Sequence, residues 1–265
     1  MGRSANRGFT IIETVLFLSI TSVLIVALLA GVTVSINTQR YQDSVSSFKS
    51  LLQGQYSDLT NVYNDREDTW TCSNSAETSD GGSSPDVRGQ SDCIVMGRYI
   101  YIQNGDISMA DVVGYESSSD QQTDLDVIRD DYELGLSSVH NEERQLEWGT
   151  RIAWPVAGTD SETVGTPRSL AILIIQSPVT QTVYTFSSDN PPDSIVDVTS
   201  DDLKAMIVAG ESVPGQASRV ICIESDGLSV SGNTSIFISA YATNASSIET
   251  RSNDFYIAQG DETRC

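Results

Sequence analysis

Nitrogen and sulfur ligands are scarce in this chain. Among its 265 residues there is one histidine, His140, and there are four cysteines, none of them in a CxxC pair. A zinc site needs more such ligands at closer spacing. A Ser-His-Asp triad would depend on His140, which lies in a polar run. We therefore assign no catalytic residue, no metal ligand and no cofactor, and the sequence does not indicate an enzyme.

Positive charge is also scarce. The chain has 15 lysines and arginines against 36 aspartates and glutamates, which gives a net charge of −21. Such a balance repels nucleic-acid phosphates, and the sequence lacks the basic clusters that release counterions on binding DNA. We expect no strong nucleic-acid binding, and the acidity is typical of a solvated surface.

Charge of either sign is missing from Thr14 to Gln39. About 20 apolar residues cross a bilayer as a helix, which satisfies its own backbone hydrogen bonds there. Arg3 and Arg7 precede the stretch, and the residues after it are acidic. The positive-inside bias therefore places the N-terminus in the cytoplasm and the bulk of the chain outside.

Two familiar kinds of N-terminal segment fit this stretch incompletely. A secretory signal peptide fits badly, because its apolar core spans only about 7–15 residues before a cleavage site with small residues. A plain signal anchor fits the length but leaves Glu13 unexplained. A carboxylate inside an apolar span costs roughly 2.5–3.5 kcal/mol, so a functional partner is expected. The alternative is that Glu13 lies at the membrane interface near the helix end.

The segment from Gly8 to Glu13 reads Gly-Phe-Thr-Ile-Ile-Glu and follows a short basic leader. It resembles the processing site of type IV prepilins and of the related type II secretion pseudopilins. The resemblance implies that a prepilin peptidase cuts between Gly8 and Phe9 and methylates the new amine of Phe9. It also implies that Glu13 is an assembly residue. The implied partners are other pilin subunits, the inner-membrane assembly platform and membrane lipid.

One feature departs from the major pilins of this family, which usually carry a proline in the membrane half of the helix. Ala30 occupies about that place, and the first proline is Pro85. Gly31 is the only weak point of the predicted helix, at about 1 kcal/mol relative to alanine. The departure fits a minor pilin or a pseudopilin better than a major pilin.

A second helical pattern continues from the apolar stretch. Apolar residues recur at steps of three and four, as on one face of a helix. They are Tyr41, Val45, Phe48, Leu52, Tyr56, Leu59 and Tyr63. One helix from Phe9 to Asn64 would be roughly 84 Å long. The predicted divisions are a leader at 1–8, a transmembrane and assembly helix at 9–34, its amphipathic continuation at 35–65 and a β-rich head at 66–265.

The head is predicted to be mostly β. Short runs rich in Val, Ile, Tyr and Phe predict strands at Ile94–Gln103, Arg151–Val156, Leu170–Gln176, Thr182–Ser187, Arg219–Glu224, Ser235–Tyr241 and Asp254–Ala258. Ser200–Gly210 predicts a short helix capped by Ser200. The polar stretch Asp106–Glu147 is ambiguous and is expected to hold loops and a short helix. The expected fold class is α+β, pilin-like, with a long helix packed on a mostly antiparallel β head. Residues 219–227 resemble the late strand and turn of GspH/FimT-type minor pilins.

The four cysteines are expected to form two disulfides, as in exported chains, and the sequence leaves three pairings open. We favour Cys72–Cys93, which closes a loop rich in Ser and Gly, and Cys222–Cys265, which fastens the chain end to a predicted strand.

Two further motifs are weak. The acidic side chains Asp124, Asp126, Asp130 and Asp131 lack the spacing of a calcium loop, so a solvated acidic face is the favoured interpretation. Asn233 and Asn244 each begin a glycosylation sequon.

These observations favour a structural subunit, a minor pilin, of a type IV pilus or related filament. Such a chain lies in the cytoplasmic membrane before assembly and in an extracellular filament or the periplasm afterwards. The alternatives are a type II secretion pseudopilin and a membrane-anchored extracellular binding module that does not polymerise. An anchored hydrolase has no supporting residues.

Overall fold

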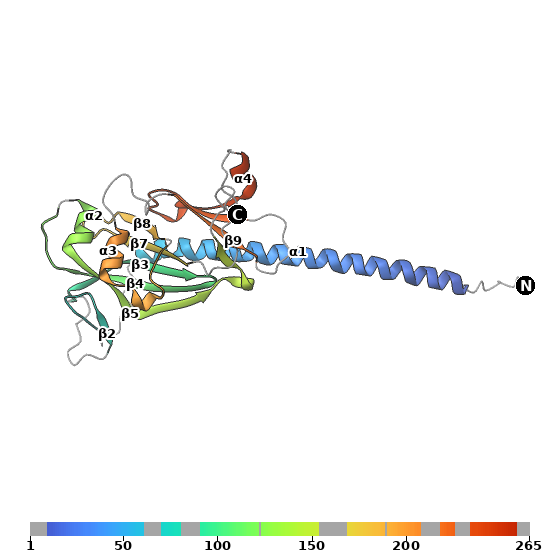
Figure 1. Cartoon of the computed structure of the whole chain (residues 1–265), viewed down its shortest axis with the longest axis horizontal. Helices are drawn as coiled ribbons and strands as arrows, with labels where there is room; N and C mark the ends of the chain where they lie inside the picture. The colour runs from blue at the N-terminus through green and yellow to red at the C-terminus, as the bar shows by residue number, and fades with distance from the viewer. Residues whose placement is uncertain are drawn as a thin grey trace, which may run out of the picture.

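The computed structural model describes residues 10–60, 70–80, 91–121, 123–153, 169–188, 190–207, 218–225 and 234–258. A long helix projects from a head built of strands, as Figure 1 shows. The fold is α+β.

The helix α1, Ile11–Thr60, has two different halves. Its large apolar side chains are exposed from Ile11 to Ile36, whereas Tyr41 is only 2 % exposed and begins the part inside the head. From there the predicted apolar stripe is confirmed at Tyr41, Val45, Phe48, Leu52 and Tyr56, which are all buried, while Leu59 is half-buried and Tyr63 lies outside the described residues. This spacing places them on one helix face, which faces the core.

The larger sheet has five strands in the order β5-β4-β3-β7-β8, and every neighbouring pair is antiparallel. Its strands are β3 (Cys93–Gln103), β4 (Asp106–Glu116), β5 (Tyr132–Gln145), β7 (Ser169–Gln176) and β8 (Val183–Ser188). The strands predicted at Leu170–Gln176 and Thr182–Ser187 are present as β7 and β8, which pair with each other as an antiparallel hairpin.

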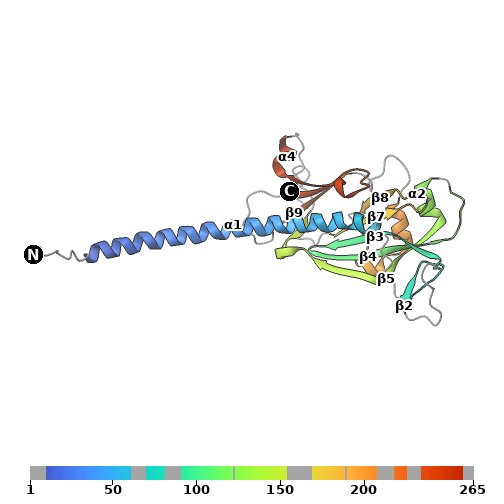
Figure 2. The same cartoon turned by 180° about the vertical axis from the view of Figure 1, so that it is seen from behind.

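The smaller sheet has four strands in the order β11-β10-β9-β6. They are β6 (Arg151–Ala153), β9 (Arg219–Glu224), β10 (Thr234–Ile238) and β11 (Ile248–Ser252). A separate hairpin joins β1 (Trp70–Cys72) to β2 (Thr78–Asp80). In both views, the half of α1 that begins at Tyr41 runs between the five-stranded and the four-stranded sheet (Figures 1 and 2).

Two buried clusters share the five-stranded sheet. On one face, Ile172 and Ile174 of β7 pack with α1 and with the isoleucines of β9 and β10. On the other face, Ala171, Leu173 and Ile175 pack with Leu203 of α3, a helix at Ser200–Met206. A strand buried on both faces reads as one continuous apolar run, which is why the sequence predicts β7.

The expectation for Asp106–Glu147 is wrong in its main part. Two long strands, β4 and β5, fill most of it, with α2 (Asp124–Asp126) and the π-helical turn η1 (Val127–Asp131) between them. The pairing of β4 with β5 shifts register between Ala110 and Val112. Such an irregularity breaks the period-two pattern that marks a strand. In addition, β5 lies at the edge of the sheet, and its C-terminal half, Ser137–Gln145, carries mostly polar residues.

Two smaller expectations are also corrected. Asp254–Ala258 belongs to a helix, α4 (Asn253–Ala258), and the strand here is β11, just before it. β11 is an edge strand with only Ile248 fully buried, so it has no strong alternation. The cap of α3 is Thr199, which forms a capping box with Asp202. Ser200 instead accepts a hydrogen bond from the Leu134 backbone N–H at 3.3 Å.

Candidate functional site

The exposed half of α1 is long and apolar enough to cross a membrane by length and composition, and a signal sequence has these same properties. Its most hydrophobic 18-residue window has a mean hydropathy of 2.7 and no buried residue. Glu13 is the only charged residue between Ile11 and Gln39. This half of the helix is therefore an unpartnered apolar surface with one carboxylate near its start.

Hydroxyl side chains in this apolar half are bonded within the helix. They donate to backbone carbonyl oxygens three or four residues earlier at distances of 2.7 to 3.0 Å: Thr14 to Ile11, Ser19 to Leu16, Thr21 to Phe17, Ser22 to Leu18, Thr33 to Leu29 and Thr38 to Val34. Hydroxyls bonded in this way need no partner from water. These six hydroxyl side chains are thus compatible with a lipid environment.

Glu13 is bonded to the residue that caps α1. The backbone N–H and the hydroxyl of Thr10 donate to Glu13 Oε2 at 2.9 and 3.0 Å, and the Glu13 N–H donates to Thr10 Oγ1 at 3.3 Å. This is a capping box, the Thr-x-x-Glu arrangement that satisfies free N–H groups at a helix start. The Thr-x-x-Glu spacing from Thr10 to Glu13 is the sequence signal for this capping role, which the charge of Glu13 alone does not reveal.

Hydrogen bonds of two tyrosine side chains hold the buried half of α1 in the head. The Tyr41 hydroxyl donates to Ile223 O at 2.9 Å and accepts from Thr234 N–H at 2.8 Å. Burial, only partly offset by the hydrogen bonds with Thr234, raises the pKa of Tyr41. Near the far end of α1, the Tyr56 hydroxyl lies 2.8 Å from Thr185 Oγ1. The two tyrosines therefore tie α1 to both sheets.

Arg98 of β3 connects α1 to the outer strands. Its Nε donates to Gln55 Oε1 at 3.0 Å, and its two terminal nitrogens pair with Asp111 at 2.5 Å and Glu142 at 2.6 Å. The Arg98 side chain is 12 % exposed. Burial disfavours the charged form of Glu142, but the Arg98 guanidinium outweighs this and holds the Glu142 pKa below its ordinary value. The guanidinium is thus the common partner of three elements.

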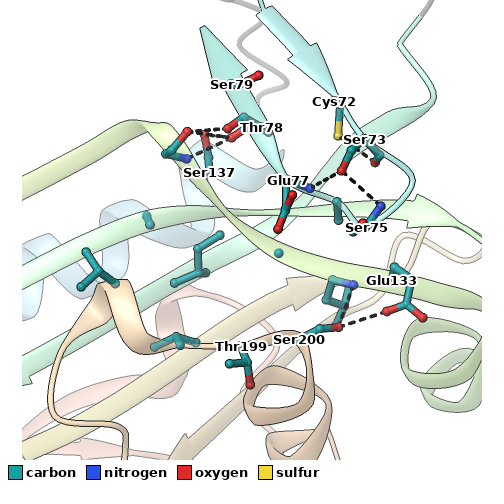
Figure 3. Close-up of a pocket in the computed structure, with 18 of the residues that line it drawn as sticks. Cys72, Ser73, Ser75, Glu77, Thr78, Ser79, Glu133, Ser137, Thr199 and Ser200 are labelled. Atoms are coloured by element: carbon teal, nitrogen blue, oxygen red, sulfur yellow. Dashed lines mark hydrogen bonds between the residues drawn. The ribbon is translucent and has the colours of Figure 1, made fainter.

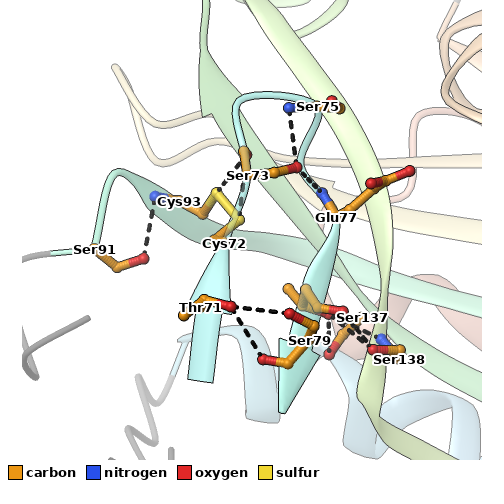
Figure 4. The surroundings of a disulfide bond; sticks show 11 residues. Thr71, Cys72, Ser73, Ser75, Glu77, Ser79, Ser91, Cys93, Ser137 and Ser138 are labelled. Carbon is orange, nitrogen blue, oxygen red and sulfur yellow. Dashed lines mark hydrogen bonds between the residues drawn. A yellow bond between two sulfur atoms is a disulfide. The ribbon is translucent and has the colours of Figure 1, made fainter. Parts of the chain in front are cut away.

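The predicted disulfide Cys72–Cys93 is present, with the two Cα atoms 6.1 Å apart. It joins the end of β1 to the start of β3, as Figure 4 shows. Next to it, β2 is attached to β5, because the Ser138 hydroxyl donates to Thr78 O at 2.6 Å. The stretch between the two cysteines, expected to be a loop, therefore includes β2, which pairs with β1, and its residues 81–90 lie outside the described residues.

A depression of about 1000 Å³ lies between the β1–β2 hairpin, β5 and the segment from η3 (Ile195–Asp197) to α3. Hydroxyl residues of all three elements line it, as Figure 3 shows. Several are bonded to neighbours: Ser73 Oγ accepts from the Glu77 N–H at 3.2 Å, and Ser200 donates to Glu133 at 3.3 Å. Glu133 also pairs with Lys204 at 3.0 Å.

The four clustered aspartates bind different groups. Asp124 accepts from the hydroxyls of Thr180 and Tyr184, Asp126 and Asp130 pair with Arg129, and Asp131 accepts from Ser118. Within the residues that the structure describes, no three His, Cys, Asp or Glu side chains are placed to hold a metal ion.

The remaining predicted site residues are only partly covered. Gly8, Phe9 and Cys265 lie outside the described residues, so leader cleavage, methylation and the pair Cys222–Cys265 stay predictions. Cys222 itself is 3 % exposed and lies on β9. Comparisons of the chain with models of protein families, with curated proteins and with solved structures found no match.

Proposed function

We propose that this chain is a filament subunit of the type IV pilin kind, inserted in a membrane through α1, shortened by a leader cut after Gly8 and assembled through the exposed half of α1. A minor subunit is the form we favour, because Ala30 stands where major pilins usually carry a proline. The head then lies on the outer side of the membrane.

The observation that carries the proposal is the continuity of α1. One helix of 50 residues is an exposed apolar surface in its first half and a buried structural element of the head in its second half. An anchor alone needs no rigid connection to its domain. A subunit that packs helix against helix needs one, because the helix must transmit its position to the head.

A second candidate function is an anchored binding module that does not polymerise. The depression lined by Ser73, Thr78 and Ser200 favours it, since concave polar surfaces are the usual place for small ligands. The β1–β2 hairpin, which lines this depression, lies at the end of the head away from the exposed half of α1 (Figure 1).

One experiment separates these functions. The mature chain is isolated from membranes and from sheared surface fibres, and its N-terminus is determined by mass spectrometry. The proposal expects a chain that begins at Phe9, carries a methylated amine and is recovered in the fibre fraction. A chain that begins at Met1 and stays in the membrane would support the anchored module. A processed chain confined to the envelope would indicate a type II secretion pseudopilin.

A further inference from the structure

Trp148 is presented to solvent by an unusual backbone conformation. It lies in the short helical turn η2 (Glu147–Gly149) with φ 59° and ψ 22°. Trp148 is 51 % exposed. A bulky residue rarely adopts the left-handed region, and such strain persists only where the surroundings hold it. An indole held outward in this way is a candidate contact surface.

The residues on both sides of Trp148 are fastened to α1. Glu147 Oε1 accepts from the Ser47 hydroxyl at 2.9 Å, and the hydroxyls of Thr150 and Ser44 lie 2.5 Å apart. These contacts lie on consecutive turns of the buried half of α1. Trp148 therefore has a defined place beside the point where α1 leaves the head.

Arg40 of α1 is the partner of Trp148. Its guanidinium carbon lies 4.8 Å from the centroid of the Trp148 ring, and Arg40 is itself exposed. It is the first charged residue after Glu13, and Tyr41, the next residue, is the first buried position of α1. The pair thus marks the boundary between the apolar half of the helix and the head.

The length of the helix places this boundary relative to a bilayer. At 1.5 Å per residue, the distance along the axis from Ile11 to Arg40 is about 43 Å. A bilayer with its headgroup layers is about 40–45 Å thick. If Ile11 lies at the inner surface, Arg40 and Trp148 lie in the headgroup layer of the outer surface.

We propose that Arg40 and Trp148 form a headgroup anchor, in which the indole lies among the phospholipid headgroups of the outer leaflet and the guanidinium binds a lipid phosphate. Tryptophan is enriched at this depth because its ring is apolar and its N–H is polar. Arginine binds phosphate through several N–H groups while stacking on an aromatic ring. With a net charge of −21, the chain is repelled by anionic surfaces at long range, so the partner is a zwitterionic phospholipid.

This inference rests on one part of the proposed function, namely that α1 spans the membrane, and adds how the head is held before assembly. A second copy of the chain covering Trp148 is the competing occupant. The test uses the full chain reconstituted in phosphatidylcholine nanodiscs that hold one chain each, which removes that competitor. Co-elution with the nanodisc measures insertion separately.

Two single-tryptophan chains provide the readout. In the first, the double substitution Trp70→Phe and Trp154→Phe leaves Trp148 as the single tryptophan. In the second, Trp148→Phe and Trp154→Phe leave Trp70, which lies on β1 in the head and serves as the control. Fluorescence is recorded with a nitroxide on the lipid headgroup, with a nitroxide in mid-chain, and with iodide in water. Far-ultraviolet circular dichroism and the Cys72–Cys93 disulfide serve as checks of folding.

We expect the headgroup nitroxide to quench Trp148 roughly twofold or more, as for a residue at the interface. The mid-chain nitroxide should quench it less, and Trp70 should respond to neither lipid. Arg40→Gln should weaken the quenching of Trp148, whereas Arg144→Gln, at an arginine that is 62 % exposed on β5, should not. If the chain co-elutes but Trp148 behaves like Trp70, the headgroup anchor is wrong and the proposed function stands. If the chain does not insert, both are wrong.

Discussion

Thr10 and Glu13 cap the first turn of α1 reciprocally, with Thr10 N–H donating to Glu13 Oε2 at 2.9 Å and Glu13 N–H donating to Thr10 Oγ1 at 3.3 Å. The carboxylate therefore has a partner within its own chain. A glutamine can take the same place in a capping box, so capping alone does not require a charge. The negative charge of Glu13 is what an assembly role needs and a capping role does not.

The first prediction separates these two roles. Glu13→Gln keeps the capping hydrogen bonds and removes the charge, while Thr10→Val keeps the charge and removes the capping hydroxyl. If the amine of one subunit meets Glu13 of another in a medium of low dielectric constant, Glu13→Gln and Glu13→Ala should insert and be processed normally. Their recovery in sheared fibres should fall roughly tenfold or more, equivalent to about 1.4 kcal/mol.

Thr10→Val is the matched control and should be recovered in fibres close to the wild-type level. Equal losses for Thr10→Val and Glu13→Gln would mean that Glu13 acts through the helix cap. Wild-type recovery of Glu13→Ala would remove the assembly role altogether.

The second prediction concerns Arg98. Arg98→Met removes the partner of Gln55, Asp111 and Glu142 while keeping much of the side-chain volume. We expect the free energy of unfolding to fall by about 2–3 kcal/mol, because the buried Gln55 and two partly buried carboxylates lose a charged donor. Arg144→Met is the control, since Arg144 is 62 % exposed and pairs with Glu142 at 3.3 Å. It should cost less than about 1 kcal/mol.

Urea unfolding of both Arg98→Met and Arg144→Met, followed by circular dichroism of the chain in detergent, measures the difference. Equal effects of the two substitutions would show that the Arg98 network does not hold α1 to the sheet.

The third prediction concerns the disulfides. Replacing both Cys72 and Cys93 with serine should lower the free energy of unfolding by about 3 kcal/mol, because the unfolded chain loses a loop constraint. The sequence separation of the two cysteines is 21 residues. Peptide mapping without reductant should also find Cys222 joined to Cys265. Free thiols, or cysteines of the two pairs joined to each other, would contradict the assignment.

The fourth prediction is a pH dependence at Asp131, a residue that is 2 % exposed. Its carboxylate accepts hydrogen bonds from the Ser118 hydroxyl at 2.7 Å and from the N–H groups of Gln121 and Asp120. The hydrogen bond from Ser118 lowers the pKa of Asp131, and the two backbone N–H donors lower it further. Burial raises this pKa but does not outweigh the hydrogen bonds, so the pKa lies below its ordinary value. A lowered folded-state pKa stabilises the fold above the unfolded pKa, and that contribution is lost as pH falls through the folded value.

Asp131→Asn should therefore lower the melting temperature at neutral pH, and the difference from wild type should shrink below about pH 4. Asp130→Asn is the control, because Asp130 is bonded to Arg129 at the surface and should change the melting temperature less. A difference between Asp131→Asn and wild type that is the same at every pH would contradict this role.

Much of the fold was predictable from the sequence because local patterns determine it. The absence of charge from Thr14 to Gln39 and the stripe that begins at Tyr41 predicted a long helix with two different halves. β7 was predictable as a continuous apolar run, and the pair Cys72–Cys93 was favoured because it closes a polar loop. In each case the signal lies within one continuous stretch of the chain.

Other features depend on contacts between distant residues, and only the tertiary structure decided them. β5 is polar along its C-terminal half and forms a strand because β4 pairs with it. Arg98 acquires its partners only when β3, β4, β5 and α1 come together. Trp148 reaches Arg40 only because Glu147 and Thr150 are bonded to α1. Local periodicity fixes which residues can be buried, but side-chain partners far apart in the chain are chosen by packing, and packing exists only in the folded molecule.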